Sequence, residues 1–510
     1  MKFFHNSSIH LFYILILLVS FVLIFSYVSP LYMVTPDDWT YIGYIREPLP
    51  LWGNWNPSKV FPETLFGIAG YISAFIVTPI TGDYLFSITF TCSFIISVFI
   101  CLYVWSFDVY ISNLFKLSDS RTILVSIFFI FLHFIVFKEQ FSDGKIYKLT
   151  FLSSCNLNLD FNYLIPFLFC SSLSLLLLTC HSNSDGKFLD YSKLGLYSNI
   201  STRHLKSNLL SNRLYASFSV LFLYLAIFSN LVDNIILIST LLFTFVIDLL
   251  NKNKKISIAN YWFYIVALFF EIICLVFEAN GGRADSLTVN YNTNLIEFFE
   301  DLKTVKRTLN YPFLRFSVYL IIISILLCSL LSFERVCKFM NFVNSNESKF
   351  YLSNIFTISF LMIVCSVYEF CLLLRIGEHR ILRTDYLVIF FFYYFVVVTI
   401  SLAYIISKIK FIFAFIPLIS FVLIISLFSG NYHYSFNGDD YDLVQNQNRD
   451  YIKQFKQADS NNQSKIKLYV NKDTNIALWK EWAGDRISQT LYKHHVIRKP
   501  MKTEIILTDR

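Results

Sequence analysis

Glycine is scarce in this chain. Only 14 of its 510 residues are Gly, and no Gly-rich phosphate-binding loop occurs. A nucleotide-binding module therefore has little to be built from, and we expect no soluble ATP or nucleotide-sugar site. The ten cysteines form no CxxC pair, and most of them lie inside apolar runs. They are typical of small residues in a membrane core, and we predict neither a disulfide framework nor a metal site.

Charge is also scarce, at 15% of the residues, whereas apolar residues make up 55% and include 56 Phe and 32 Tyr. This composition predicts an all-α polytopic membrane protein. The formal net charge of +7 then bears on membrane topology and on contact with anionic membrane lipid. We expect no nucleic-acid partner.

Apolar runs of about 20 residues predict about eleven transmembrane helices. The first run has no small-residue cleavage pattern behind it, so we expect a retained helix and not a signal peptide. The run 64–81 is shorter and contains Gly67, Gly70 and Pro79, which favours an interfacial or re-entrant segment. The predicted spans are 10–33, 84–107, 122–138, 161–180, 214–230, 232–250, 261–278, 313–332, 351–374, 386–406 and 411–428.

Five connections rich in Lys or Arg fall on the same side of the membrane if eleven helices cross it and 64–81 does not. By the positive-inside rule that side is the cytoplasm, so the N-terminus is expected inside. The basic connections lie at 116–121, 181–213, 252–255, 335–349 and 408–410. The segments then expected outside are the loops 34–63, 139–160, 279–312 and 375–385 and the tail 429–510.

Composition divides the chain into a transmembrane domain, 1–428, and a polar extracytoplasmic tail, 429–510. Strand patterns at 465–470 and 504–507 around a helical stretch at 476–492 predict that the tail is a small α+β unit. Within the outer loop 279–312, apolar residues from Leu295 to Leu309 share one helical face. This spacing predicts an amphipathic helix on the outer leaflet.

Two adjacent carboxylates, Asp37 and Asp38, follow the first span within a few residues. They are expected at the outer membrane surface beside Trp39 and Tyr41, which we predict to contact the substrate. A carboxylate at this boundary can act as a base toward a substrate that is itself part lipid. We therefore predict that Asp37 is the catalytic base and that Asp38 orients it, binds a metal if one is used, or contacts the acceptor sugar.

The same residues have a structural interpretation. Thr35 is a favourable N-cap, Pro36 suits the first helical position, and acids in the first turn complement the helix dipole. The two interpretations are compatible, because a capped helix start is also a rigid mount for a functional acid.

A second candidate feature is the short outer loop 375–385, which carries Arg375, His379, Arg380 and Arg383. Translocated loops this short normally avoid positive charge. An anionic ligand would explain the exception, since guanidinium binds phosphate through a planar, bidentate fork. We predict that these four residues hold a donor phosphate. The alternative is a self-neutralising cluster in which the arginines pair with Glu369, Glu378 and Asp385.

Three further polar residues lie within predicted spans. Glu278 sits near the outer end of its helix and is a candidate for contacting a polar substrate. Glu271 is midway along the same helix and is nearly alone as a deep charge; it is either functional or a protonated group hydrogen-bonded within the bundle. His133 is expected to be a core histidine.

An acid pair, an arginine cluster and amphipathic segments on one face indicate a site for a phosphate-bearing lipid and a polar co-substrate. The reaction that fits is glycosyl transfer from a polyprenyl-phosphate sugar. A carboxylate removes the proton of the acceptor hydroxyl while arginines stabilise the departing lipid phosphate. No cofactor is required, although a divalent cation is compatible with this chemistry.

The arrangement, with Asp37-Asp38 after the first span, resembles the GT-C superfamily of membrane glycosyltransferases, whose first outer loop carries an Asp-containing motif. More narrowly, the chain resembles the bacteriophage-type serotype-converting glucosyltransferases that modify O-antigen. The resemblance implies an inverting enzyme of the bacterial inner membrane acting on the periplasmic face. It also implies undecaprenyl-phosphate glucose as donor and lipid-linked O-antigen as acceptor.

Two other classes of function fit part of the pattern. An O-antigen polymerase would also have many spans and outer arginines, but the loop 279–312 would be central and the acid pair dispensable. A flippase or transporter for a lipid-linked saccharide would carry charged residues deep in several helices. Because Glu271 is nearly alone as such a charge, this class of function ranks third.

Overall fold

The computed structural model describes thirteen stretches of the chain. The predicted span 411–428 and most of the arginine loop, 377–383, lie outside the described residues. The structure describes residues 8–46, 57–142, 145–148, 150–152, 156–181, 209–250, 258–280, 295–332, 345–376, 384–408, 431–432, 441–471 and 481–508.

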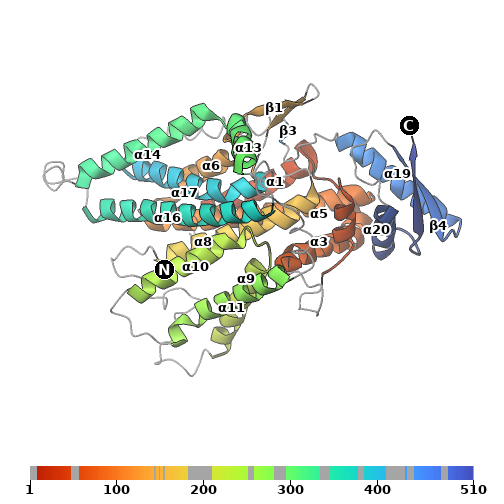
Figure 1. Cartoon of the computed structure of the whole chain (residues 1–510), viewed down its shortest axis with the longest axis horizontal. Coiled ribbons are helices and arrows are strands. Elements are labelled where there is room, and N and C mark those ends of the chain that lie inside the picture. Colours follow the sequence, from red (N-terminus) through yellow and green to blue (C-terminus); the bar gives the residue numbers. More distant parts are fainter. Residues whose placement is uncertain are drawn as a thin grey trace.

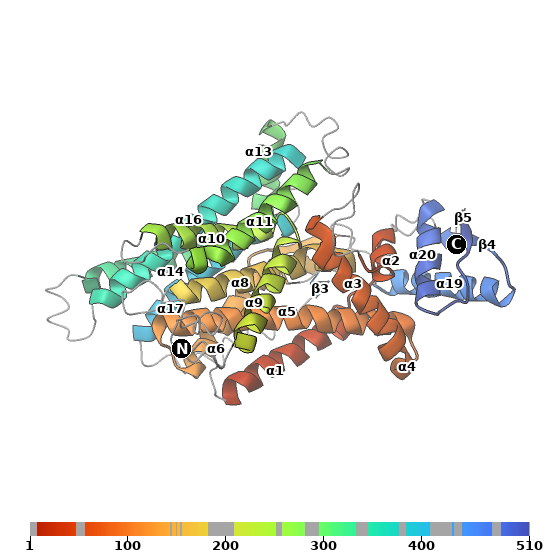
Figure 2. The same cartoon turned by 90° about the horizontal axis from the view of Figure 1, so that it is seen from below.

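Most of the described chain is helical, and its long helices lie side by side in one elongated bundle (Figures 1 and 2). The helices are α1 (Ser8–Leu23), α2 (Pro36–Ile42), α3 (Val60–Ile72), α4 (Thr78–Thr81), α5 (Tyr84–Phe115), α6 (Asp119–Ile135), α7 (Leu157–Leu159), α8 (Ile165–His181), α9 (Leu209–Ile227), α10 (Asn234–Leu250), α11 (Ile258–Asn280), α13 (Leu295–Thr308), α14 (Tyr311–Ser332), α16 (Ser345–Ile376), α17 (Thr384–Lys408), α19 (Tyr441–Ser460) and α20 (Glu481–Lys493). Short π-helical or 3₁₀ turns are η1 (Ile24–Val28), η2 (Pro57–Lys59), η3 (Ser73–Val77) and η4 (Asp160–Leu164).

Seven helices of the described chain are long and apolar enough to cross a membrane. Every predicted span apart from 411–428 coincides largely with a helix, which confirms the prediction of a helical membrane protein. The total of eleven spans and the orientation remain predictions. The seven helices are Ser8–Val28, Pro57–Thr81, Tyr84–Phe115, Leu157–Thr179, Tyr311–Cys328, Tyr351–Leu373 and Tyr386–Ser407.

Helix α5 packs against α1, α6 and α8, and its contact with α8 is the most extensive among the described helices (Figure 2). Its hydroxyl side chains find acceptors inside the apolar bundle, so they can be buried without loss of hydrogen bonds. Ser93 donates to the carbonyl of Phe25, and Thr89 donates to that of Leu31, at 2.9 and 2.7 Å. These two bonds fasten the chain at the end of the first span to α5.

Residues 57–81 form one helix in which η2, α3, η3 and α4 follow one another. The ring of Phe61 lies 6.0 Å from that of Phe99 in α5, and the Thr81 hydroxyl lies 2.6 Å from the Ser87 hydroxyl. Both ends of this helix therefore lie beside the N-terminal half of α5. Its length and apolarity suit a membrane span, and the interfacial or re-entrant interpretation stays a prediction.

The segments predicted to lie outside gather at one end of the bundle. The loop 139–160 contains the antiparallel hairpin of β1 (Glu139–Ser142) and β2 (Lys145–Lys148), and β3 (Asn431–Tyr432) of the tail pairs in parallel with β2. The amide of Lys138 donates to the carbonyl of Thr308 at the end of α13, 2.7 Å away. The tail also contacts the loop 34–63, because the Thr490 hydroxyl donates to the Trp39 carbonyl at 2.6 Å.

The described tail, 441–471 and 481–508, packs α19 and α20 against a parallel pair of strands, β4 (Lys465–Asn471) and β5 (Lys502–Thr508). The strands and α20 lie where the sequence predicts them. Helix α19 is missing from the sequence-based prediction. Its buried side chains include Tyr451 and Phe455, and β4 alternates exposed and buried residues as expected for a one-sided strand.

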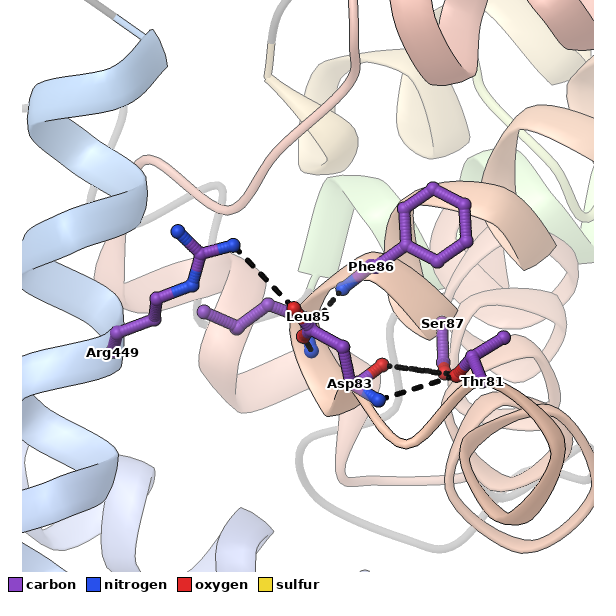
Figure 3. Close-up of polar contacts among 6 residues, drawn as sticks. All are labelled: Thr81, Asp83, Leu85, Phe86, Ser87 and Arg449. Carbon is purple, nitrogen blue, oxygen red and sulfur yellow. Dashed lines mark hydrogen bonds and ion pairs between the residues drawn. The ribbon is translucent and has the colours of Figure 1, made fainter.

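Asp83 is the N-cap residue of α5, and its side chain stabilises the start of this helix (Figure 3). Its Oδ1 accepts from the amides of Leu85 and Phe86, at 2.9 and 3.1 Å, and its Oδ2 lies 3.4 Å from Arg449 of the tail. Asp83→Ala is expected to lower the free energy of unfolding by about 1–2 kcal/mol, because two amides lose their acceptor. Asp83→Asn keeps the acceptor and loses only an exposed ion pair, which is worth less than about 1 kcal/mol. Unfolding of the detergent-solubilised protein measures both, and equal losses would show that Arg449, not the cap, is what matters.

Candidate functional site

The acid pair lies at the start of α2, in a complete capping arrangement. The Thr35 hydroxyl accepts from the amide of Asp38, while the Asp38 side chain accepts from the amide of Thr35 at 2.6 Å. Pro36 occupies the first helical turn, where its missing N–H costs nothing. The structural interpretation of this motif is therefore confirmed for Asp38.

Asp38 is fully buried, and both of its carboxylate oxygens are occupied. Oδ2 accepts from the amides of Val34 and Thr35 and from the Thr35 hydroxyl, and Oδ1 accepts from the amide of Asn158 at 2.7 Å. Burial raises the pKa of Asp38 to about 6, and the hydrogen bonds from Thr35, Val34 and Asn158 oppose that rise. The group is thus mainly ionised at neutral pH and has no surface for a substrate.

Asp37 has the opposite environment. It is exposed, and it makes no polar contact with any described residue. Successive residues on a helix point about 100° apart, so the burial of one acid leaves the other facing away. The role of Asp37 as the base stays a prediction, whereas the buried and fully hydrogen-bonded Asp38 has no oxygen left for a metal, an acceptor sugar or Asp37.

The two aromatic residues predicted to contact substrate differ in exposure. Trp39 is 1% exposed, and its ring belongs to the core, so it offers no surface to a substrate; the prediction for this residue is wrong. The carbonyl of Trp39 is engaged as well, since it accepts from the Thr490 hydroxyl of the tail at 2.6 Å. Tyr41 is partly buried against the core, and its predicted role stays a prediction.

Lys59 is a cation near the acid-pair helix that the sequence-based prediction misses. Its Nζ donates to Asn162 Oδ1 at 2.8 Å and lies 5.1 Å from the ring centre of Tyr163. The Asn162 side chain in turn donates to the carbonyl of Asn158, the residue whose amide binds Asp38. A chain of hydrogen bonds therefore connects the anchored acid to a partly exposed lysine.

Only the two ends of the arginine loop belong to the described residues. His379, Arg380 and Arg383 lie outside the described residues, and Arg375 lies in the last turn of α16, where only the backbone is described. Tyr386, at the start of α17, lies 6.4 Å from Tyr163 between ring centres. The start of α17 is thus close to the ring that Lys59 covers.

Glu278 is half-buried, and its Oε1 accepts from the amide of Ser58 at 3.1 Å. It therefore stabilises the start of η2, next to Lys59. Its predicted contact with substrate is not tested by this geometry. The contact does place Glu278 at the same end of the bundle as the acid pair.

The interpretation of Glu271 as a nearly solitary deep charge is wrong. Glu271 accepts from the side-chain amide of Asn234 at 3.0 Å, in agreement with the hydrogen-bonded alternative. Several other carboxylates are buried too, each at most 8% exposed: Asp108, Asp160, Asp233 and Glu369. His133 is a core histidine, as predicted, held between the Phe129 carbonyl and the Tyr103 hydroxyl at 2.8 and 3.2 Å.

The described part of the chain contains no group of three or more His, Cys, Asp or Glu residues placed to hold a metal ion. No protein-family model, curated protein or solved structure matches the chain. The described residues at this end of the bundle provide an exposed carboxylate, Asp37, and a lysine over a tyrosine face, Lys59.

Asparagine substitutions separate the structural acid from the exposed one. In Asp38→Asn an amide N–H₂ must face at least one of the backbone N–H donors, so the free energy of unfolding should fall by about 1–3 kcal/mol. Asp37→Asn loses no described contact and should change it by less than about 0.5 kcal/mol. Thermal unfolding of the two purified variants measures the difference. Equal destabilisation would mean that Asp37 also has a structural role.

Proposed function

We propose that the chain is an inverting membrane glycosyltransferase of the GT-C type. In this proposal it transfers a hexosyl unit, glucosyl by resemblance, from a polyprenyl-phosphate donor to O-antigen or another cell-surface polysaccharide. The observation that supports it best is the division within the acid pair. One carboxylate anchors α2 to the bundle and is connected through Asn158 and Asn162 to Lys59, and the adjacent one is exposed.

Asp37 acts as the general base in this proposal. It accepts the proton of the acceptor hydroxyl as that oxygen attacks the anomeric carbon, and the bond from this carbon to the phosphate oxygen breaks. The lipid phosphate leaves with the bonding electron pair and gains negative charge. Inversion follows because attack and departure occur on opposite faces of the sugar.

Lys59 and the arginines 375, 380 and 383 stabilise the phosphate as its charge develops. The Lys59 ammonium is oriented by Asn162 and supported by the Tyr163 ring, so little ordering is required when an anion arrives. Guanidinium groups add bidentate contacts that a lysine cannot make.

A lipid-linked saccharide transporter is a second candidate, because carboxylates are buried on several elements of the bundle. Buried acids in spans often form cation or proton paths. The hydrogen bond between Asn234 and Glu271 gives one of these acids a structural role, which favours the transferase.

Asp37→Asn tests the base. An amide cannot accept the proton, so turnover should fall about 10²–10⁴-fold while the amount of folded protein stays normal. The measurement is glycosylated polysaccharide formed per molecule of membrane-inserted enzyme. Glu300→Gln, which alters an exposed carboxylate on α13, is the matched control and should retain full activity. Full activity in Asp37→Asn would remove the base from the mechanism and favour the polymerase or transporter.

Lys59→Met tests the phosphate contact. The substitution keeps the apolar length of the side chain and removes its charge, so donor affinity should fall about 10–100-fold, as for a lost hydrogen bond to a charged group. Lys303→Met on α13, where the lysine is 62% exposed, is the control. Donor binding to solubilised protein is measured with a radiolabelled polyprenyl-phosphate sugar. Unchanged affinity in Lys59→Met would leave the lysine with a structural role only.

A further inference from the structure

The tail is docked on α2 through α20 and the turn that follows it (Figure 2). Thr490 donates its hydroxyl proton to the carbonyl of Trp39, which is two residues from Asp37. The packing is close, because a Cβ at Gly43 would lie 2.1 Å from the Thr490 hydroxyl oxygen. The Asn448 side chain of α19 adds a bond to the carbonyl of Met33, just before α2, at 2.9 Å.

His494 completes this interface from the turn after α20. It is 3% exposed, and its Nδ1 shares a hydrogen bond of 2.6 Å with the hydroxyl of Tyr84, in the first turn of α5. The ring also meets the edge of Tyr71 in α3, with 5.3 Å between centres. One histidine thus joins the tail to α3 and α5, beside the helix that carries the acid pair.

We propose that Thr490 and His494 are positioning residues that hold α2 in place, and that the tail releases α2 when His494 gains a proton. The docking part stands on the contacts alone, whereas the consequence for catalysis rests on the proposed function. If the tail faces outward, as the topology predicts, it meets the pH of the medium directly.

The surroundings of His494 disfavour its charged form. Burial lowers the pKa to about 4, with the positive charges of Lys493 and His495 acting in the same direction and the Ile42 carbonyl acting against them. The charged groups on the same segment as His494 are Lys493, His495 and, further away, Arg486. The titratable groups that face it from α3 and α5 are Tyr71 and Tyr84. No carboxylate is among the groups that shift it.

The sign of the pH effect follows from this lowered pKa. A freed His494 has an ordinary pKa near 6.5, so docking is fully favoured above that pH and weakens as the pH falls toward 4. Between pH 8 and pH 5, the ratio of docked to released tail should fall about 30-fold.

Cysteine accessibility measures this ratio without any assay of activity. In the full-length protein carrying Thr490→Cys, the new thiol is covered by α2 and reacts with a maleimide only when the tail is released. Labelling is measured on the tryptic peptide 487–493, which contains no native cysteine, and is normalised to the free peptide at the same pH. The normalised rate should rise about 30-fold from pH 8 to pH 5.

Ser488→Cys provides the control on the same peptide. Ser488 is fully buried inside the tail and accepts from the amide of Met501 at 2.7 Å, so it becomes accessible only if the tail itself unfolds. It should stay protected at pH 5. Equal exposure at both positions would show unfolding of the tail and overturn the proposed release.

His494→Gln in the Thr490→Cys background assigns the pH dependence. Glutamine keeps a hydrogen-bonding side chain without a titrating group, so labelling should no longer change between pH 8 and pH 5. A persistent 30-fold change would assign the effect to another group and overturn the role of His494.

Transferase activity, measured on the native chain and on His494→Gln, then tests the link to catalysis. Loss of activity at pH 5 that parallels labelling, and is absent from His494→Gln, supports positioning of α2 by the tail. Activity that persists while the tail is released would overturn the positioning role. A chain that shows the labelling pattern but no transferase activity at any pH would instead reject the proposed function and leave the release intact.

Discussion

The hydrogen bonds of Asp38 are the contacts on which this end of the molecule depends. A buried carboxylate is costly unless each lone pair has a donor, and here four donors from two separate parts of the chain converge on it. Three of them come from the N-terminus of α2 and its cap. The fourth is the amide of Asn158, more than a hundred residues away, so the same carboxylate that starts α2 also attaches it to the bundle.

From Asn158 the polar contacts continue across the end of the bundle. The Asn162 side chain bonds to the carbonyl of Asn158 and orients Lys59, while its own carbonyl accepts from Asn230 at 2.7 Å. The backbone of Asn230 accepts from Asn234, whose side chain reaches Glu271. Hydrogen bonds in a low-dielectric interior strengthen one another, and releasing any one of these residues would leave buried polar groups unsatisfied. Lys59 is thereby held in place by Asn162 and, through it, by the rest of this network.

The sequence predicts the helices well because hydropathy over twenty residues is a local property. The strands of the tail are equally local, since β4 shows the alternation in its own seven residues. Helix α19 was not predicted because it is polar overall and its apolar face, with Tyr451 and Phe455, is meaningful only beside β4. The burial of Asp108 was not predicted either. The predicted span ends before this charged residue, at 107, because hydropathy falls there, whereas α5 continues to Phe115.

The candidate site was predictable in part. The acid pair and its cap are a short-range motif, so both interpretations followed from neighbouring residues. Lys59 carries no local signal, because its importance arises from Asn162 and Tyr163, which are about a hundred residues distant. Trp39 was misassigned for the opposite reason. Aromatic residues at a membrane surface suggest contact with a ligand or lipid, and only the three-dimensional packing shows that this ring is enclosed in the core.

In the proposed function, the two adjacent acids of α2 divide two tasks that one carboxylate could not perform together. A single carboxylate that bonded to the bundle would be unavailable to a substrate, and a single exposed one would leave the helix start unsatisfied. Two adjacent acids on one helix avoid the conflict, since their side chains diverge by about 100°. Asp38 can then be buried and hydrogen-bonded to donors from two chain segments, while Asp37 makes no polar contact with a described residue. A helix of only seven residues suffices as the mount because the tail, through Thr490, holds it from the other side.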